Sequence, residues 1–266
     1  GETLMQTLRL STEQPTPFQE LQTAAVQWVV TGTVLDRPLQ FPVTKPLLPL
    51  GRHAIGRAES IAIDGTLTDW GELRFAVRRQ GDILSPDLDP ADASYRFDVR
   101  EGAEHLFLAI DVTDDDVQVL PDLIPRSQDA VLLFIDPRPA PQRNRPMSAG
   151  EAALGGDMAA QVATIVATGD ALTDELLGFV QETNAAIDYR VQRTDGGYAA
   201  EFAIPLALIG EKAAAAGFPA GDWREARISI GIYDLDAGDH APTPLFWQPY
   251  RYGNASLPGT ELFVRP

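Results

Sequence analysis

Short segments in which hydrophobic and polar residues alternate dominate the chain from Ile61 onward. Tyr95, Phe97 and Val99 alternate with arginine and aspartate, so one face of that segment is expected to be buried. Residues 105–112 and 130–135 are apolar at nearly every position, which predicts central strands covered on both faces. Further strands are predicted at residues 161–168, 187–193, 198–204, 228–234, 245–247 and 261–264. Turn-forming residues separate these segments, a rhythm typical of an antiparallel β-sandwich.

One predicted helix has clear start and end signals in the sequence. Pro205 fixes the backbone of a first turn, residues 206–216 are rich in helix formers, and Gly217 can end the helix. Residues 173–181 are a weaker second candidate. Asp195-Gly196-Gly197 predicts a hairpin turn between two strands. Residues 137–156 have the composition of a long inserted loop. The fold predicted from these patterns is all-β with one or two short helices.

The first fifty residues have a mixed pattern. Phe18, Leu21, Ala25 and Trp28 have helical spacing, whereas residues 26–34 are rich in β-branched side chains, and strands are favoured after Ala25. The proline-rich run 38–49 predicts a connector into the next domain. Residues 1–50 are therefore interpreted as an N-terminal extension or the end of an upstream domain, and residues 51–266 as the sandwich domain.

Composition narrows the class of partner. The 266 residues are 44% hydrophobic, enough for a substantial core, and 38 acidic against 21 basic residues give a net charge of −17. Such a surface repels phosphate backbones and anionic lipid, so no nucleic acid partner is expected. The absence of cysteine excludes disulfides and thiolate chemistry. No apolar run reaches the length of a membrane span, and the start at Gly1 without a leader segment suggests a piece of a longer protein.

Four ordered motifs carry a family resemblance: Ile63-Asp64-Gly65 with Asp69-Trp70, the strand 106–112 followed by Asp114, Gln128-Asp129 leading into residues 131–136, and residues 197–205 with Glu201. Together they resemble the carbohydrate-binding modules of family nine and the wider DOMON-like superfamily, over about residues 61–266. The resemblance implies a β-sandwich and a non-catalytic carbohydrate-binding role, outside the cell or in the periplasm.

The residues of these four motifs also have structural interpretations that do not depend on the resemblance. Asp64-Gly65 suits a turn, because aspartate bonds nearby backbone and glycine accepts a positive φ. Trp70 is interpreted as a core residue rather than a sugar platform. Glu201 lies on the opposite face of its strand from Tyr198 and Phe202, where it is expected to be either solvated or a ligand.

The resemblance implies a sugar held between two aromatic rings, and the sequence departs from that pattern. Arg126 stands where the family has its first tryptophan, Leu132 replaces an acidic residue, and a sugar-binding arginine falls near Ala163. The forked guanidinium group of an arginine can bind sugar hydroxyls or a carboxylate, so an acidic saccharide is an alternative ligand.

The second aromatic position is better preserved. Tyr252 is the nearest match in spacing, and Tyr250 and Trp247 lie close to it in the chain. A buried strand end is the alternative reading of Trp247. Tyr252, Tyr250, Trp247 and Arg126 are the candidate ligand-binding residues, because stacking needs exposed rings and polar groups beside them.

Two acidic clusters follow predicted strands. Calcium takes six to eight oxygen ligands, and loops with closely spaced aspartates supply them. The resemblance also implies structural calcium in some members. Solvated acidic loops are the alternative in so acidic a chain. The candidate metal ligands are Asp111, Asp114, Asp116, Asp234, Asp236 and Asp239.

Haem and catalysis are not expected. Some DOMON-like relatives bind haem through methionine with histidine or lysine, but the three methionines and three histidines here have no diagnostic spacing. No G-x-S-x-G elbow, phosphate-binding loop or H-E-x-x-H motif occurs. The sequence favours a module that recognises a glycan for a larger extracellular or periplasmic protein. The alternative is a structural or sensory protein-interaction domain that has kept the fold and lost the sugar site.

Overall fold

The structure is a computed structural model that describes residues 25–34, 37–46, 52–77, 89–120, 127–136, 163–168, 187–215, 223–247 and 261–266. The chain divides into two compact units, Gly1–Pro49 and Leu50–Pro266. Of the interpreted segments, the loop 137–156 and the second helix candidate 173–181 lie outside the described residues.

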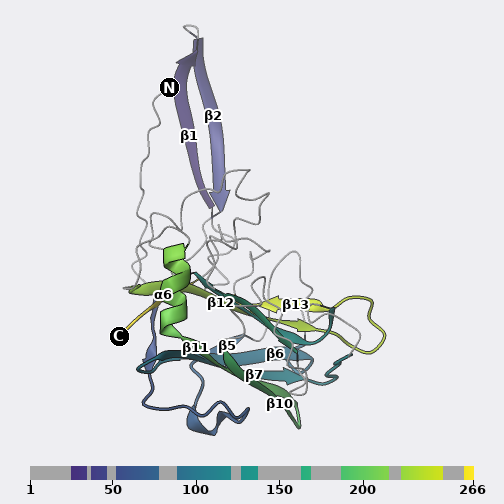
Figure 1. Cartoon of the computed structure of the whole chain (residues 1–266). Coiled ribbons are helices and arrows are strands. Elements are labelled where there is room, and N and C mark those ends of the chain that lie inside the picture. The colour runs from purple at the N-terminus through teal and green to yellow at the C-terminus, as the bar shows by residue number, and fades with distance from the viewer. Residues whose placement is uncertain are drawn as a thin grey trace. The chain divides into compact units, whose positions relative to one another are not determined.

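The first unit contains a hairpin of two antiparallel strands, β1 (Ala25–Val34) and β2 (Arg37–Pro46), seen side by side in Figure 1. The strand predicted after Ala25 is confirmed. The connector predicted over residues 38–49 is wrong, because residues 38–46 belong to β2. Its prolines at 38, 42 and 46 share one side of the strand, where a missing N–H does not disturb the pairing with β1.

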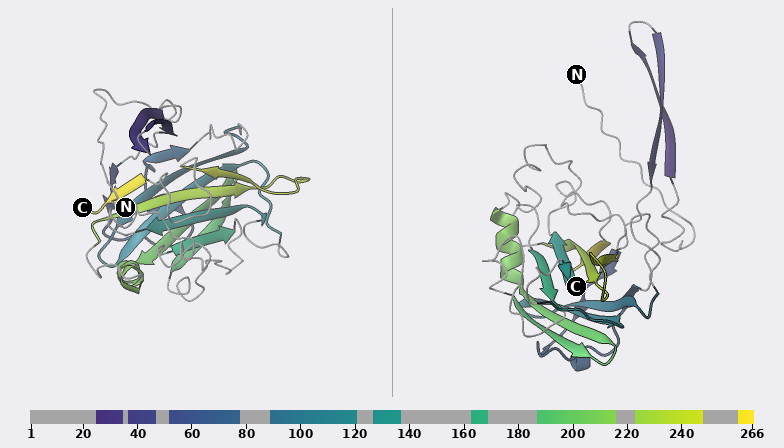
Figure 2. Two further views of the ribbon diagram at one scale, coloured as in Figure 1. Left: turned by 90° about the horizontal axis from the view of Figure 1, so that it is seen from above. Right: turned by 90° about the vertical axis from the view of Figure 1, so that its right-hand side faces the viewer.

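The second unit is a sandwich of two six-stranded sheets (Figures 1 and 2). The first sheet has the order β10-β11-β7-β6-β4, with β5 also paired to β6. It is made of β4 (Gly56–Arg57), β5 (Phe75–Val77), β6 (Ala93–Glu101), β7 (His105–Asp114), β10 (Asp188–Thr194) and β11 (Gly197–Pro205).

The second sheet has the order β3-β14-β12-β8-β9, with β13 also paired to β12. It is made of β3 (Arg52–Ala54), β8 (Ala130–Asp136), β9 (Ala163–Thr168), β12 (Glu225–Asp234), β13 (Thr243–Phe246) and β14 (Glu261–Val264). The predicted sandwich and its long strands are confirmed. The prediction of a purely antiparallel arrangement needs correction, because β14–β3 and β4–β6 are parallel pairs.

The main core lies between the sheets. Phe97, Leu108 and Phe202 from the first sheet and Leu133 and Ile230 from the second are all fully buried members of one cluster. The Tyr95 hydroxyl crosses the interface and donates to the Ile230 carbonyl over 2.8 Å, which satisfies a polar group that would otherwise be costly to bury. The core therefore contains residues from both the alternating and the continuously apolar segments that predicted strands.

Two predicted local features are confirmed beside β11. Thr194 pairs with Gly197 across the predicted hairpin turn. At Gly197, φ is 138° and an added Cβ would lie 2.1 Å from the Val112 carbonyl oxygen, so only glycine fits. The predicted helix is α6 (Leu206–Ala215), which begins directly after Pro205. No helix among the described residues combines the length and apolar character of a membrane span.

A loop formed by residues 64–70 lies on the outer face of the first sheet. It is tied to that sheet by Glu201, which is fully buried. Its Oε1 accepts a hydrogen bond from Trp70 Nε1 over 2.8 Å, and its Oε2 accepts from the backbone N–H groups of Gly65 (2.7 Å) and Asp64 (3.1 Å). Glu201 does lie opposite Tyr198, as expected, but the solvated and ligating roles are wrong because this loop covers the carboxylate.

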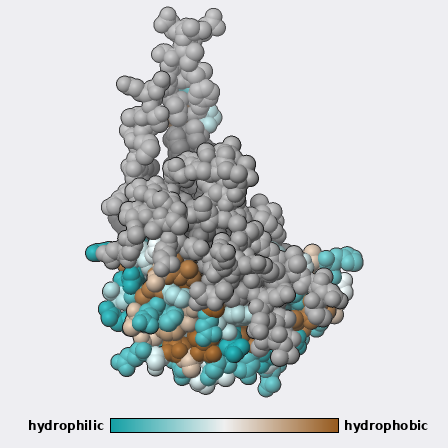
Figure 3. All heavy atoms as spheres, in the orientation of Figure 1, coloured by the Kyte–Doolittle hydropathy of each residue, from teal (hydrophilic) through white to brown (hydrophobic). Residues whose placement is uncertain are grey.

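The same loop forms a second, smaller core. Trp70 is 2% exposed and packs in a cluster with Leu73, Phe107 and Ala203, which confirms its reading as a core residue. Figure 3 shows hydrophilic and hydrophobic residues intermixed on the described part of one face of the sandwich. The outer face of the first sheet is thus partly a second interior rather than solvent-exposed surface.

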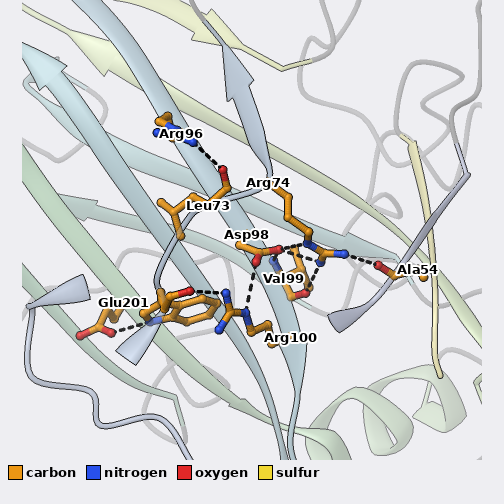
Figure 4. Close-up of polar contacts among 9 residues, drawn as sticks. Ala54, Leu73, Arg74, Arg96, Asp98, Val99, Arg100 and Glu201 are labelled. Carbon is orange, nitrogen blue, oxygen red and sulfur yellow. Dashed lines mark hydrogen bonds and ion pairs between the residues drawn. The ribbon is translucent and has the colours of Figure 1, made fainter. Parts of the chain in front are cut away.

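An ion-pair network reinforces that loop (Figure 4). Asp98, 1% exposed, accepts from Arg74 Nε over 2.6 Å and from Arg100 Nε over 3.1 Å. Arg100 also donates to the Trp70 carbonyl, and its guanidinium lies 4.9 Å from the centre of the Trp70 ring. Arg74 donates to the Ala54 carbonyl over 3.0 Å. Because both arginines bind backbone as well as the buried carboxylate, the network fixes the loop against β3 and β6.

Candidate functional site

The antiparallel order of the strands gathers aspartates from distant parts of the chain. Asp114 is the last residue of β7 and pairs with Ala93, the first residue of β6, so Asp92 lies next to it. Asp234 is the last residue of β12, and Asp129 directly precedes β8, the neighbour of β12. Strand ends of both sheets therefore place carboxylates at the same end of the sandwich.

Three of these carboxylates are buried together. Asp114, Asp129 and Asp234 are 5%, 0% and 4% exposed, and each offers an oxygen within 4.8 Å of the others. We call these three residues the buried aspartate cluster. A second group of the same size shares Asp234 and adds Asp92 and Asp236, which are partly exposed. Asp234 therefore belongs to both groups.

Asp129 also holds the two loops that carry the cluster. Its Oδ1 accepts from the Leu235 N–H over 2.8 Å, and its Oδ2 accepts from the Gln118 N–H. Asp116 joins the same loops, since its Oδ2 accepts from the Ala237 N–H over 2.9 Å. These hydrogen bonds connect the loop after β7 to the loop after β12. The positions of the aspartates are therefore fixed by hydrogen bonds to the backbone.

Burial together raises the pKa of each carboxyl in the cluster. Removal from water is the largest cause in all three cases, and the neighbouring aspartates add to it. The pKa of Asp114 is raised to about 6, that of Asp129 to about 7 and that of Asp234 to about 8. Hydrogen bonds from backbone N–H groups partly offset the shifts at Asp114 and Asp129. Negative charge here is therefore costly near neutral pH.

The Tyr198 hydroxyl is the polar group next to this charge. The side chain is fully buried, and its oxygen has no hydrogen-bond partner within the part of the chain that the structure describes. Burial raises the pKa of Tyr198 well above its usual value, and Asp129, Asp114 and Asp234 are the charges that raise it further. A buried hydroxyl without a partner beside three carboxylates calls for a bound polar species.

The chemistry of the cluster fits a hard cation. Carboxylate oxygens are the ligands that calcium prefers, and a cation would remove the mutual repulsion that raises these pKa values. Asp114, Asp129 and Asp234 would hold the ion, and Asp92 or Asp236 could contribute from the more exposed side. Such an ion would supply local charge balance and loop rigidity.

The predicted metal ligands separate into two sets. Asp114, Asp234 and Asp236 are brought together, and Asp116 lies in the same pair of loops. Asp111 and Asp239 are exposed and belong to neither group. Sequence analysis did not select Asp92 or Asp129 as ligands, although Asp129 carried part of the family motif. The signal for both was their position immediately before a strand.

Trp247 is the only candidate sugar-binding residue within the described part of the chain; Tyr250, Tyr252 and Arg126 lie outside it. The Trp247 ring is half-buried and packs against the main core. Its centre lies 4.7 Å from that of Phe97, 5.4 Å from Phe75 and 5.5 Å from His53. Much of the ring therefore serves the interface between the sheets.

The other positions in the sugar-site alignment are partly described. Leu132 is 3% exposed and clusters with Ala130 and Tyr233, on the face of its sheet opposite the main core. Ala163 is the first residue of β9. Among the histidines, His53 lies in the aromatic cluster, whereas His240 is exposed in the loop after β12.

Comparison with solved structures identifies the fold. No protein-family model and no curated protein matches the sequence. A family 9 carbohydrate-binding module from Caldicellulosiruptor kristjanssonii in complex with glucose superposes with a TM-score of 0.59 at 13% identity, over 81% of this chain and 96% of that one. The same kind of module in complex with cellotriose gives 0.58 at 13% identity, over 81% and 93%. The chain has the β-sandwich fold of family 9 carbohydrate-binding modules.

Proposed function

We propose that this chain is a non-catalytic carbohydrate-binding module that recognises a glycan for a larger extracellular or periplasmic protein. The observation that carries the proposal is the match of 81% of the chain to two structures described as carbohydrate-binding modules with bound sugars. The fold alone does not fix the ligand, because one fold hosts many functions. The ligand therefore depends on the residues of the site.

The proposed ligand-binding residues are Tyr252, Tyr250, Trp247 and Arg126. Trp247 is packed on one side by the aromatic cluster, which leaves a half-buried ring to carry at most one face of a sugar. A rigidly held ring loses little entropy when it stacks on a ligand. The tyrosines that follow it in the chain would supply the second surface, and Arg126 would bind hydroxyls or an acidic group.

Replacing Tyr252 with alanine is expected to reduce glycan binding at least about tenfold while leaving the melting temperature unchanged, because stacking on an exposed ring contributes to affinity and little to folding. Glycan-array screening followed by calorimetry on the best glycan measures the effect. Tyr252→Phe is the matched control, since it keeps the ring and should keep most of the affinity. Equal affinity in the alanine variant would exclude Tyr252 from the site. Silence of the unchanged protein across the array would favour the structural or sensory interaction domain instead.

We also propose a structural role for calcium at the buried aspartate cluster. The support is the burial of three carboxylates within 4.8 Å of one another, beside a Tyr198 hydroxyl that has no hydrogen-bond partner among the described residues. Calcium bound there would stabilise the loops after β7 and β12 without taking part in a reaction. The effect of the ion on stability is expected to be large enough to measure directly and to depend on pH.

A further inference from the structure

The two outer edges of the β1–β2 hairpin differ in the residues that line them. In the described part of the chain, β1 and β2 pair only with each other. A two-stranded ribbon is marginally stable alone, and its outer edges present unpaired backbone groups that can accept another strand. Along each strand, alternate residues direct their N–H and C=O groups toward the partner strand or away from it.

The outer edge of β2 is closed by proline. Pro38, Pro42 and Pro46 are separated by even numbers of residues, so all three point their backbone nitrogen in the same direction. That direction must be outward, because a proline facing β1 would remove a hydrogen bond from the ladder. Only Gln40 and Thr44 keep an outward N–H between them. A continuous ladder cannot form on this edge.

The outer edge of β1 has no partner strand in the part of the chain that the structure describes. The register pairs Val29 with Pro42, Thr33 with Pro38 and Ala25 with Pro46, so these residues and those midway between them also face outward. None of them is proline and none is charged. The Val29 side chain is 58% exposed at the centre of the strand. Charged residues and prolines are the usual protection of an edge strand, and β1 has neither.

We infer that β1 pairs with β1 of a second copy of this chain, antiparallel across a two-fold axis at Val29. In this register, Val29, whose backbone N–H and C=O groups point away from β2, lies opposite Val29 of the second copy. Gln27 lies opposite Thr31 of the second copy. On the other face, Trp28 lies opposite Val30. Polar positions meet polar ones, and an aromatic position meets a β-branched one, which is a favourable cross-strand pair. The strand is therefore complementary to itself.

Charge and length favour a second copy as the occupant. Antiparallel self-pairing brings no like charges together, because the only basic residues of the hairpin strands, Arg37 and Lys45, are both on β2. Two hairpins joined in this way give a sheet of four strands, which passes the minimum for independent stability. The prolines of β2 then line both outer edges, so the assembly ends at the dimer.

Sedimentation equilibrium and size-exclusion chromatography with light scattering on the full chain test this inference. The unchanged protein is expected to dimerise with increasing concentration. Val29→Pro removes both hydrogen bonds at the two-fold axis and none between β1 and β2, so the dimer dissociation constant should rise about tenfold or more. Val29→Lys keeps the N–H but sets two positive charges opposite each other, and it should weaken the dimer similarly.

Gln40→Pro is the matched control, since it introduces the same change on the edge that proline already closes. It should leave the dimer intact. Circular dichroism and the melting temperature of the sandwich verify that each variant is folded. A protein that stays monomeric at millimolar concentration overturns the inference. So does a dimer that Val29→Pro and Val29→Lys leave unchanged, because the contact would then lie elsewhere.

The prolines give a second, independent readout. Replacing Pro38, Pro42 and Pro46 together with threonine restores the missing donors on β2 and opens the second edge. With both edges open, the ribbons can add to one another without limit, so light scattering should show assemblies larger than the dimer. Dimers only, in this triple variant, would show that proline does not limit the assembly and would contradict the edge argument.

Discussion

Replacing Glu201 with alanine is expected to lower the melting temperature by roughly 10 °C, which corresponds to about 3–5 kcal/mol for a domain of this size. The carboxylate is fully buried and is the acceptor for Trp70 Nε1 and for the N–H groups of Gly65 and Asp64. An alanine leaves all three donors without this acceptor, and a buried donor without a partner costs about 1–3 kcal/mol. Differential scanning calorimetry measures the change.

Two further variants serve as comparisons for Glu201→Ala. Glu201→Gln keeps the size of the side chain but turns an NH₂ group toward donors on one side, so its stability should lie between those of the unchanged protein and Glu201→Ala. Glu72→Ala removes an exposed carboxylate whose ion pair with Arg96 spans 3.1 Å at the surface, and it should change stability by less than about 1 kcal/mol. Equal melting temperatures for Glu201→Ala and Glu72→Ala would refute the anchoring role of Glu201.

The second large effect concerns calcium and pH. Near pH 8, calcium at a hundred times its dissociation constant should stabilise the fold by about 2.7 kcal/mol. For a domain of this size that raises the melting temperature by roughly 5–10 °C over the value in chelator. At pH 5 the buried aspartate cluster holds protons, which a cation must displace, so the calcium effect should be much smaller. Thermal scans with calcium or chelator at both pH values measure this difference.

The sign of the pH effect without calcium follows from the raised pKa values. The folded state keeps protons on Asp114, Asp129 and Asp234 that the unfolded chain has released, so folding is favoured at low pH. This contribution is complete below the unfolded aspartate pKa near 4 and is lost as pH rises through about 6 to 8. In chelator, stability should therefore fall from about pH 4 to about pH 8.

Asp234→Asn separates a cation site from ordinary acidic loops. The amide resembles the protonated acid, so at pH 8 in chelator this variant should be more stable than the unchanged protein, by on the order of 3 kcal/mol. It should also lose most of the response to calcium. Asp239→Asn, in the same loop but exposed and outside both groups, should match the unchanged protein. A calcium response that Asp234→Asn retains in full would remove the cluster as its source.

The sequence predicted the strands where alternation was long enough to read. β6, β7, β8 and β11 appeared from their buried residues, and the turn at Gly197 and helix α6 appeared from glycine and proline. The strands β3, β4 and β5 escaped prediction because three residues or fewer carry no measurable period. β2 escaped because its prolines resemble a linker until their shared outward direction is known.

The candidate site was predictable only in part. Asp114 and Asp234 could be selected because each ends a strand within a local run of acids. Asp92 and Asp129 join them only through the pairing of β6 with β7 and of β8 with β12, which is a property of the folded sheets. Glu201 shows the same limit, since its strand position predicted the correct face but not the loop from residues 64–70 that covers it.

The parallel pairing of β3 with β14 also determines how the sandwich carries mechanical load. Arg52 pairs with Leu262 and Ala54 with Val264, and the Ile55 N–H donates to the Val264 carbonyl over 2.8 Å. Tension that pulls Arg52 and Val264 apart acts along these two strands in opposite directions. The hydrogen bonds between them are then sheared together rather than opened one after another. The first and last strands of the sandwich are thus joined in the geometry that resists stretching.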